Sequence, residues 1–350
     1  MKKINVAING FGRIGRAFFR LASLRPEINI VALNDLAEQK VARYLLEYDT
    51  VYGHGGFSTS YNEEGKWPRL IINDKPIFFF NEKDPKKLPW KSLEVDIVVE
   101  ATGVFASYAA SQVHLDAGAK RVVVTAPVKD EPAPGISGST VLMGVNEDKL
   151  KVCDISSNAS CTTNAGSPVI AILEEALGIQ KAMLNTIHGY TASQSLVDSP
   201  NKKDLRRGRA AAQNIIPSTT GAANATTKAI KALSDKFDGI AIRVPVVAGS
   251  IVDITFLSKK DTSVEEVNSI LETASREERW SKVFSVTKEP IVSSDIIGSP
   301  FASIADLSFT RVVDGDLVKV LAWYDNEMGY ANALTEHVIK SGYYAVEGRK

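Results

Sequence analysis

The stretch that decides the fold is INVAINGFGRIGRAFFRLASL, residues 4–24. A short β-branched run leads into the glycine-rich segment GFGRIG at residues 10–15, and an amphipathic run follows it. A second strand-like run, INIVALN at residues 28–34, ends next to Asp35, twenty positions after Gly15. Strand, glycine turn, helix, strand and terminal acid in this order form the fingerprint of a dinucleotide-binding βαβ unit.

Each part of this fingerprint has a chemical reason. Gly10, Gly12 and Gly15 permit a tight turn and let the backbone approach a pyrophosphate, while the helix N-terminus offers unpaired N–H groups and a positive dipole end. Asp35 would accept hydrogen bonds from ribose hydroxyls, and its charge would repel a 2′-phosphate. We therefore expect a dinucleotide site that favours NAD over NADP. A purely structural glycine turn is the alternative interpretation.

The rest of the chain predicts two kinds of sheet. The runs VDIVVEA (95–101) and RVVVTAP (121–127) continue the alternation of strands and helices, which is typical of a parallel sheet with crossover helices. From about residue 160 the strand-like runs lengthen, as in SIVDITFL (250–257), and mix with helical patterns. The predicted fold is a Rossmann-type parallel α/β domain followed by an α+β domain with a largely antiparallel sheet.

Composition limits the function classes. The chain has 350 residues, which favours two domains, and it has 41 basic and 41 acidic residues, so no global basic field recruits nucleic acid. No apolar run approaches the roughly 20 residues of a membrane span. The two cysteines, Cys153 and Cys161, and an N-terminus without a signal-type segment predict a reduced, cytoplasmic setting. The four histidines show no spacing typical of a zinc site.

Cys161 lies in SNASCTTNAG, residues 157–166, just before the apolar run PVIAIL. Ser160 and Thr162 are suited to a helix N-cap and first turn, and a helix N-terminus favours a thiolate and could hold an oxyanion. His188, in LNTIHGYT, stands where an apolar strand ends in a polar turn and is the candidate base. An inert buried cysteine and a structural histidine remain the alternatives on these residues alone.

A series of motifs across nearly the whole chain resembles phosphorylating glyceraldehyde-3-phosphate dehydrogenase, in that family's order. They are INGFGRIGR, LND, SNASCTTN, TIHGYT, DLRRGRAAA, NIIPSTTGAA, RVPV and AWYDNEMGY. The resemblance implies that Cys161 attacks the aldehyde of D-glyceraldehyde 3-phosphate and that His188 acts as the base. NAD would take the hydride, and inorganic phosphate would release the thioester as 1,3-bisphosphoglycerate, in glycolysis or gluconeogenesis.

The same resemblance assigns binding roles residue by residue. The residues implied for the substrate phosphate are Thr191 and Arg243, those for the attacking phosphate are Ser160, Thr162, Thr220 and Gly221, and Arg209 would lie near both. The residues implied for the cofactor, besides the three glycines and Asp35, are Arg13 and Ile14 at the pyrophosphate, Thr102 and Thr125 on the nicotinamide side, Asn326 at the carboxamide and Lys83 near the adenine. Ser193 stands where the family often has an aspartate, and NADP use stays open because of the segment around Ser199.

The resemblance also implies domain limits and an assembly. Residues 1–160, joined by a C-terminal helix at 327–350, would form the NAD-binding domain, and residues 161–326 the catalytic domain. The family is usually a homotetramer, in which the loop at 191–213 packs near a neighbour's cofactor site. Erythrose-4-phosphate dehydrogenase, which typically lacks the HxYT and TTGAA pairing found here, and a non-catalytic scaffold are the alternatives.

Overall fold

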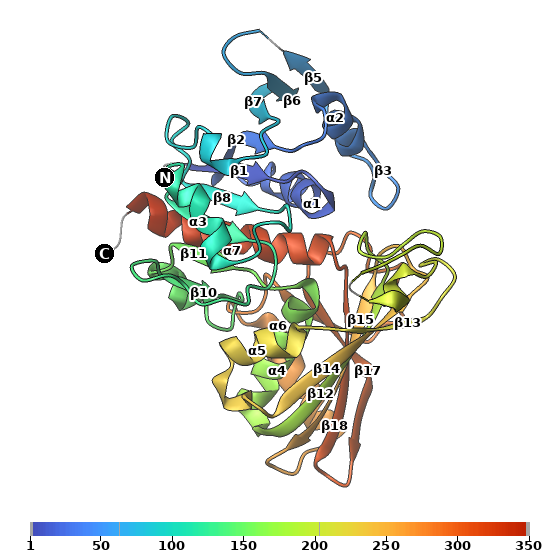
Figure 1. The fold of residues 1–350 in the computed structure, drawn as a ribbon. Coiled ribbons are helices and arrows are strands. Elements are labelled where there is room, and N and C mark those ends of the chain that lie inside the picture. The colour runs from blue at the N-terminus through green and yellow to red at the C-terminus, as the bar shows by residue number, and fades with distance from the viewer. Residues whose placement is uncertain (1–2, 63, 203, 348–350) are drawn as a thin grey trace. The chain divides into compact units, whose positions relative to one another are not determined.

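The structure is a computed structural model that describes residues 3–62, 64–202 and 204–347. The chain divides into two compact units, and Figure 1 shows their elements coloured along the sequence. The first unit comprises Met1–Val141, Asn146–Ala159 and Leu334–Lys350, and the second comprises Leu142–Val145 and Ser160–Ala333. The domain limits after residues 160 and 326 stay predictions, because compactness alone does not test whether a segment folds independently.

The first unit is built on a nine-stranded sheet of order β10-β11-β9-β8-β1-β2-β7-β6-β5, in which every pair from β10 to β7 is parallel. The sheet strands are β1 Ile4–Asn9, β2 Ile28–Asn34, β5 Thr59–Asn62, β6 Arg69–Ile72, β7 Lys75–Phe80, β8 Ile97–Glu100, β9 Arg121–Val124, β10 Gly138–Thr140 and β11 Ile155–Ser157. A small hairpin pairs β3 Tyr48–Asp49 with β4 Gly53–His54. The helices are α1 Arg13–Ala22, α2 Gln39–Glu47 and α3 Tyr108–Asp116, with short 3-10 turns at η1 Pro85–Lys87 and η2 Glu147–Lys151.

The central strands of this sheet are buried on both faces. All four residues of β8 and of β9 are buried, as are most residues of β1. Continuous β-branched runs of this kind belong to parallel sheets whose two faces are both covered. The predicted Rossmann-type unit is therefore confirmed, and its crossover begins at the glycine turn between β1 and α1.

The second unit contains a seven-stranded sheet of order β13-β14-β12-β15-β18-β17-β16. Four of its strand pairs are antiparallel, while β12–β14 and β16–β17 are parallel. The strands are β12 Ile179–Gly189, β13 Ile216–Thr219, β14 Phe237–Val244, β15 Ser250–Ser258, β16 Phe284–Thr287, β17 Ser303–Val313 and β18 Leu317–Tyr324. The helices are α4 Cys161–Leu177, α5 Ala222–Ala229 and α6 Val264–Arg276, with 3-10 turns η3 Leu205–Gly208 and η4 Lys231–Leu233. The prediction of a largely antiparallel α+β unit is confirmed.

The core of the second unit lies on one face of this sheet. Residues of β15 alternate between buried and half-buried, which is the pattern of a sheet covered on one side. Its buried set, which includes Val252, Ile254 and Phe256, packs in one cluster with α4 residues such as Val169 and Ile170. Helix α4 is therefore anchored along its length, and its first residue, Cys161, is held at a fixed place.

Helix α7, Met328–Glu347, closes the described chain, and its residues from Leu334 onward belong to the first unit. Within that unit the buried His337 contacts the Ser156 hydroxyl at 2.7 Å through Nε2 and the Asn158 side-chain oxygen at 3.1 Å through Nδ1. These two bonds tie α7 to β11 and the residue after it. No helix in the described residues is both long and apolar enough to span a bilayer.

Candidate active site

The turn between β1 and α1 is shaped by its glycines. Gly10 has a φ of +96°, and a Cβ built there would lie 2.6 Å from the backbone nitrogen of Thr102. A Cβ on Gly15 would collide with the carbonyl of Gly10, whereas one on Gly12 would meet nothing within 4 Å. Gly12 is the N-cap of α1. The first and third glycines therefore let the chain pack on itself, and the second leaves the helix N-terminus open to a ligand.

A cavity of about 400 Å³ lies at this turn, within the first unit. Five residues predicted for the cofactor line it together: Gly10, Gly12, Asp35, Lys83 and Thr102. A concave site that combines a bare helix N-terminus with a carboxylate at the end of the next strand fits a dinucleotide. The residues present therefore fit NAD.

The remaining residues predicted for the cofactor lie outside the lining of this cavity. Arg13 forms an ion pair with Asp49 at 2.8 Å, and Ile14 and Gly15 are part of α1. Thr125 follows β9, and its N–H donates to the carbonyl of Glu100 at 3.0 Å. Asn326 belongs to the second unit, where its Oδ1 accepts from the Gly249 N–H at 3.0 Å, which fixes the orientation of the amide.

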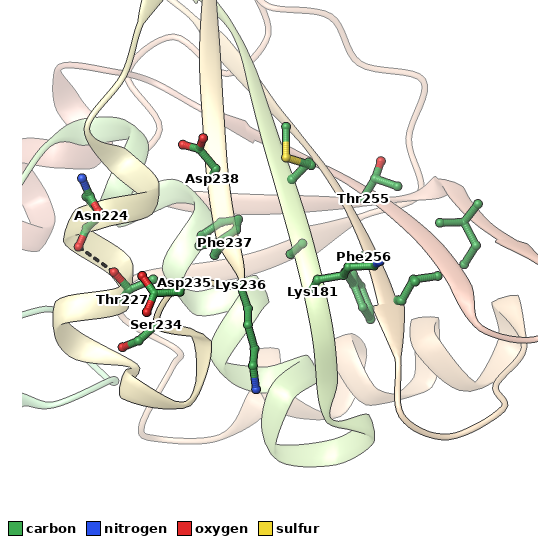
Figure 2. A pocket seen from close by; sticks show the side chains of 14 residues that line it. Lys181, Asn224, Thr227, Ser234, Asp235, Lys236, Phe237, Asp238, Thr255 and Phe256 are labelled. Atoms are coloured by element: carbon green, nitrogen blue, oxygen red, sulfur yellow. Dashed lines mark hydrogen bonds between the residues drawn. The ribbon is translucent and has the colours of Figure 1, made fainter.

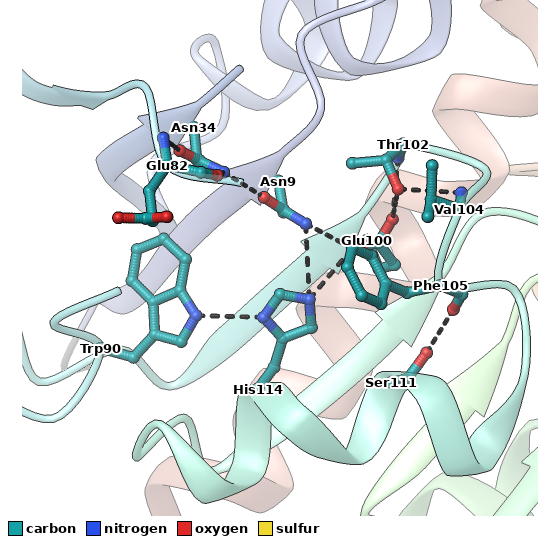
Figure 3. A network of polar contacts seen from close by, with 10 residues as sticks. All are labelled: Asn9, Asn34, Glu82, Trp90, Glu100, Thr102, Val104, Phe105, Ser111 and His114. Carbon is teal, nitrogen blue, oxygen red and sulfur yellow. Dashed lines mark hydrogen bonds and ion pairs between the residues drawn. The ribbon is translucent and has the colours of Figure 1, made fainter. Parts of the chain in front are cut away.

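Behind the cavity lies a buried polar network that the sequence did not predict (Figure 3). Glu100, 1% exposed, accepts from the Asn9 side chain at 2.6 Å and contacts Nε2 of His114 at 3.0 Å. Its other carboxylate oxygen accepts from the N–H of Thr102 at 2.8 Å and from the Thr102 hydroxyl. Asn9 and Thr102 both line the cavity, so one carboxylate holds two of its walls.

The protonation of His114 follows from its partners. The indole N–H of Trp90 is only a donor, and it lies 3.1 Å from Nδ1 of His114, so Nδ1 must accept. The ring proton is then on Nε2, from which it is donated to Glu100. His114 is therefore neutral, and the Glu100 carboxylate is held by neutral donors alone.

In the second unit, Cys161 is the first residue of α4, with Ser160 as the N-cap. The Ser160 hydroxyl accepts from the N–H of Thr163 at 3.1 Å. Nε2 of His188, near the end of β12, lies 3.3 Å from the Cys161 sulfur. The two predicted catalytic residues are thus in direct contact, as a nucleophile and its base require.

The electrostatics of this pair follow from burial and from one cation. Burial raises the pKa of the Cys161 thiol, and the charge of Arg243 partly offsets that effect. Burial lowers the pKa of His188 to about 3, and the charge of Arg243 makes a smaller contribution in the same direction. His188 is therefore neutral in the protein at pH 7, which is the form that can accept a proton.

Tyr324 links the two elements that carry the predicted catalytic residues. Its buried hydroxyl contacts the Thr162 hydroxyl at 3.0 Å and the Thr186 hydroxyl at 2.8 Å. Its ring also meets the ring of His188 edge-on, at 5.8 Å between centroids. Tyr324 therefore clamps the first turn of α4 to the end of β12. Sequence reasoning missed it, because a tyrosine at the end of a strand carries no signal for such a role.

Arg243 lies beside His188 because of the register of the sheet. In the parallel pair of β12 and β14, Arg243 is the direct partner of His188. Its Nη1 lies 2.6 Å from Nδ1 of His188 and donates to the Gly189 carbonyl at 3.1 Å. Arg207 donates from Nε to the Ser218 hydroxyl at 2.9 Å, on β13, the strand in which Ile216 is the register partner of Arg243. Arg209 instead pairs with Asp198 at 2.7 Å on the surface.

The other residues predicted for phosphate lie on neighbouring elements of the same unit. Thr191 follows β12 by two residues, and its hydroxyl contacts that of Ser193 at 2.9 Å. Thr220 precedes α5, where its hydroxyl accepts from the N–H of Ala222 at 3.2 Å, and Gly221 is the N-cap. Among the described residues no group of three histidine, cysteine or acidic side chains is placed to hold a metal ion.

A larger hollow of about 910 Å³ lies elsewhere on the second unit (Figure 2). Its lining includes Lys181 and Met183 in the first half of β12, Lys236 just before β14 and Asp238 near the start of β14. His188 lies seven residues further along β12 than Lys181, about 23 Å at the usual rise of a strand. None of the predicted site residues lines this hollow, so size alone does not identify the active site.

Comparisons with known proteins agree with this geometry. Residues 4–108 match the family model described as glyceraldehyde 3-phosphate dehydrogenase, NAD binding domain, and residues 160–326 match the model of the C-terminal domain. A glyceraldehyde-3-phosphate dehydrogenase of Thermotoga maritima is 49% identical over 95% of this chain and 97% of its own length. The glyceraldehyde-3-phosphate dehydrogenase of Geobacillus stearothermophilus is 44% identical over 95% of this chain and 96% of its own length. Glyceraldehyde-3-phosphate dehydrogenase 3 of Saccharomyces cerevisiae is 41% identical over 97% of this chain and 100% of its own length.

Proposed function

The chain belongs to the glyceraldehyde 3-phosphate dehydrogenase family, and we propose that Cys161 and His188 carry its chemistry. As a member it is an NAD-dependent oxidoreductase that oxidises glyceraldehyde 3-phosphate. The observation that supports the residue roles is the 3.3 Å contact between the Cys161 sulfur and Nε2 of His188 at the start of α4. A thiol at a helix N-terminus beside a neutral imidazole suits covalent catalysis.

The first step forms a bond between the Cys161 sulfur and the aldehyde carbon. The thiol proton passes to Nε2 of His188 and from there to the aldehyde oxygen, which gives a hemithioacetal. The N–H groups of the first turn of α4 are oriented to stabilise the negative charge that develops on that oxygen. His188 then takes the hydroxyl proton as the carbon loses a hydride, and a thioester remains on Cys161. NAD, when bound, accepts that hydride.

We propose that inorganic phosphate releases the thioester. A phosphate oxygen attacks the acyl carbon, the carbon–sulfur bond breaks, and an acyl phosphate leaves as Cys161 regains its electron pair. Hydroxyls, N–H groups and guanidinium forks suit phosphate oxygens, and Thr162, Thr220 and the N-terminus of α5 offer them. Arg207, near Arg243, supports this site better than Arg209, which is paired with Asp198.

Two coarser proposals accompany this mechanism. We propose a cytoplasmic location, because Cys153 and Cys161 are not joined in a disulfide and thiols stay reduced in that compartment. We also propose a homotetramer, supported by the uncovered face of the seven-stranded sheet. On that face Met183, Ile240 and Leu317 are 57%, 51% and 40% exposed. A second copy of the chain, through a symmetric contact, is the occupant that would cover such a surface.

The experiment that tests the residue roles compares two cysteine substitutions. Cys161→Ser should abolish NADH formation from glyceraldehyde 3-phosphate, because a serine hydroxyl is a far weaker nucleophile beside a neutral base. Cys153→Ser is the control and should keep activity, since Cys153 lies buried in the first unit against Val141 and Leu150. Substantial turnover by the Cys161→Ser protein would contradict the proposal.

A further inference from the structure

The turn that carries Asp35 is held on one side by its own carboxylate. Asp35 follows β2, and the turn continues through Ala37 to Glu38, the N-cap of α2. One carboxylate oxygen of Asp35 accepts from the Phe11 N–H at 2.6 Å, in the glycine turn. The other accepts from the Ala37 N–H at 2.8 Å. Each carboxylate oxygen has more than one lone pair, so Asp35 can still accept from the ribose hydroxyls of a cofactor.

The same turn is held from another side by Asn81. The side-chain NH₂ group of Asn81 donates to the Asp35 carbonyl at 2.8 Å and to the Ala37 carbonyl at 3.2 Å. A carbonyl oxygen only accepts, so two of them beside one amide require that its NH₂ group faces the turn. One side chain therefore joins both ends of the turn at residues 35–37, whose conformation orients the Asp35 carboxylate.

The register of the first sheet brings Asn81 to this place. In the parallel pair of β2 and β7, Asn34 is the partner of Phe80, and the Asp35 N–H donates to the Phe80 carbonyl at 3.1 Å. Asn81 is the next residue, where the chain leaves β7. It lines a separate hollow of about 570 Å³ together with Glu38, whereas Asp35 lines the cofactor cavity. Asn81 therefore acts on the cofactor site through Asp35.

We propose that Asn81 is a positioning residue for the selection of NAD over NADP. It holds the turn so that the Asp35 carboxylate stays directed at the adenosine ribose, where it accepts from the hydroxyls of NAD and repels the 2′-phosphate of NADP. The inference rests on the expected role of Asp35 in the cofactor site. Without Asn81 the carboxylate stays charged, but the turn is free to move. The ribose hydroxyls then lose a fixed acceptor, and the 2′-phosphate loses a fixed neighbour of like charge.

The test is calorimetric titration of the cofactor-free full-length protein with NAD and with NADP. Asn81→Ala should weaken NAD binding by about tenfold, because two hydrogen bonds that orient the acceptor are lost. The affinity for NADP should fall much less, because weaker repulsion of the 2′-phosphate offsets the lost orientation. Asn29→Ala is the matched control and should change neither affinity. Asn29 is also exposed in the first unit, and its NH₂ group donates to the Asn5 side chain at 2.9 Å.

A second substitution separates a positioning role from a general loss of structure. Asp35→Ala should itself weaken NAD binding, and adding Asn81→Ala to it should have no further effect, since the group that Asn81 holds is gone. If the double variant does not fold, the ratio of NAD affinity to NADP affinity in Asn81→Ala decides alone. That ratio should be lower than in the wild-type protein.

Three results would overturn the proposal: wild-type NAD affinity in Asn81→Ala, an equal loss of affinity for NAD and NADP, or the same loss of NAD affinity when Asp35 is already replaced. Failure of the expected role of Asp35 would look different, because Asp35→Ala would then bind NAD as tightly as the wild-type protein, and the proposal would fall with it. The proposed function stands apart from these results, because the Cys161→Ser protein tests it.

Discussion

Glu100 shows how a single side chain supports the cofactor site without reaching it. The carboxylate is 1% exposed and receives hydrogen bonds from Asn9, His114 and Thr102. Asn9 in turn accepts from Asn34 at 2.7 Å, at the end of the neighbouring strand (Figure 3). The ends of β1, β2 and β8 are thereby fixed around one negative charge. A buried charge satisfied by several donors holds its partners more firmly than neutral bonds do.

Glu100→Gln should weaken NAD binding by about tenfold, because the glutamine NH₂ would face donors in place of one acceptor oxygen. The Michaelis constant for glyceraldehyde 3-phosphate and the alkylation rate of Cys161 should not change, since both depend on the second unit. Calorimetric titration with NAD gives the affinity. Glu147→Gln, which removes a carboxylate paired with Lys340 in the same unit, is the control. Equal NAD affinity in both variants would contradict a positioning role for Glu100.

At the residue scale the sequence singled out Cys161 and His188, the two residues that we propose react, but not the side chains that hold them in place. Cys161 and His188 carry chemistry in their own side chains, and each stands next to a recognisable boundary of a helix or strand. Tyr324 and Glu100 act through neighbours that only the folded sheets bring to them. Arg207 and Arg209 lie two positions apart, at the 3-10 turn Leu205–Gly208, and yet Arg207 donates to Ser218 on β13 whereas Arg209 pairs with Asp198.

At the element scale, the turn between β1 and α1 offers a matched pair of glycines. Gly10→Ala should lower thermal stability, because a Cβ there would lie 2.6 Å from Thr102 N on a backbone with φ of +96°. Strain of this kind costs about 1–3 kcal/mol. Gly12→Ala should leave stability nearly unchanged, because its Cβ meets nothing within 4 Å. Thermal melts of the cofactor-free proteins compare the two, and equal melting temperatures would contradict this account of the turn.

Helix α7 should make stability depend on pH through His337. Burial lowers the pKa of His337 to about 3, so the unfolded chain binds a proton that the folded chain does not as pH falls below about 6.5. The free energy of unfolding should therefore fall on acidification, by about 1.4 kcal/mol per pH unit for this group. His337→Gln should remove that contribution to the slope. Urea unfolding at several pH values measures it, and an unchanged slope would contradict the assignment.

Helices and strands were predicted correctly where the pattern of apolar residues extends over several residues. The runs that became β1, β2, β8, β9 and β15 have continuous or alternating apolar residues over most of their length, and polar residues at 160–164 mark the start of α4. The three-residue strands β10 and β11 are too short for any periodicity to be distinct. Strand β11 pairs with β9 and β10 pairs with β11, and in each case the partner is separated by more than ten residues of sequence.

At the scale of the whole molecule, the division of the chain was only partly predictable. Leu142–Val145 belongs to the second unit although the segments on both sides belong to the first. Contacts with two side chains hold this segment in the second unit. Arg279 donates to the Gly144 carbonyl at 2.5 Å, and the Trp280 ring packs against Gly144. Contacts across more than a hundred residues leave no local pattern.

The assembly should respond to charge on the uncovered sheet face. Met183→Lys and Ile240→Lys together should break the proposed homotetramer into smaller species, because a buried interface does not tolerate unpaired charges. Light scattering coupled to size-exclusion chromatography measures the mass. Val152→Lys, at a 58% exposed position of the first unit, should leave the mass unchanged. A double variant that keeps the wild-type mass would exclude this face as an interface.

The most direct test of the central claim, covalent oxidation on Cys161, is the time course of NADH formation after rapid mixing with glyceraldehyde 3-phosphate and NAD. Without phosphate, the account predicts a burst of one NADH per Cys161, followed by a slow phase as the thioester hydrolyses. With phosphate, it predicts sustained turnover, and Cys161→Ser should show neither. Sustained turnover without phosphate and with no burst would contradict a thioester that waits for phosphate.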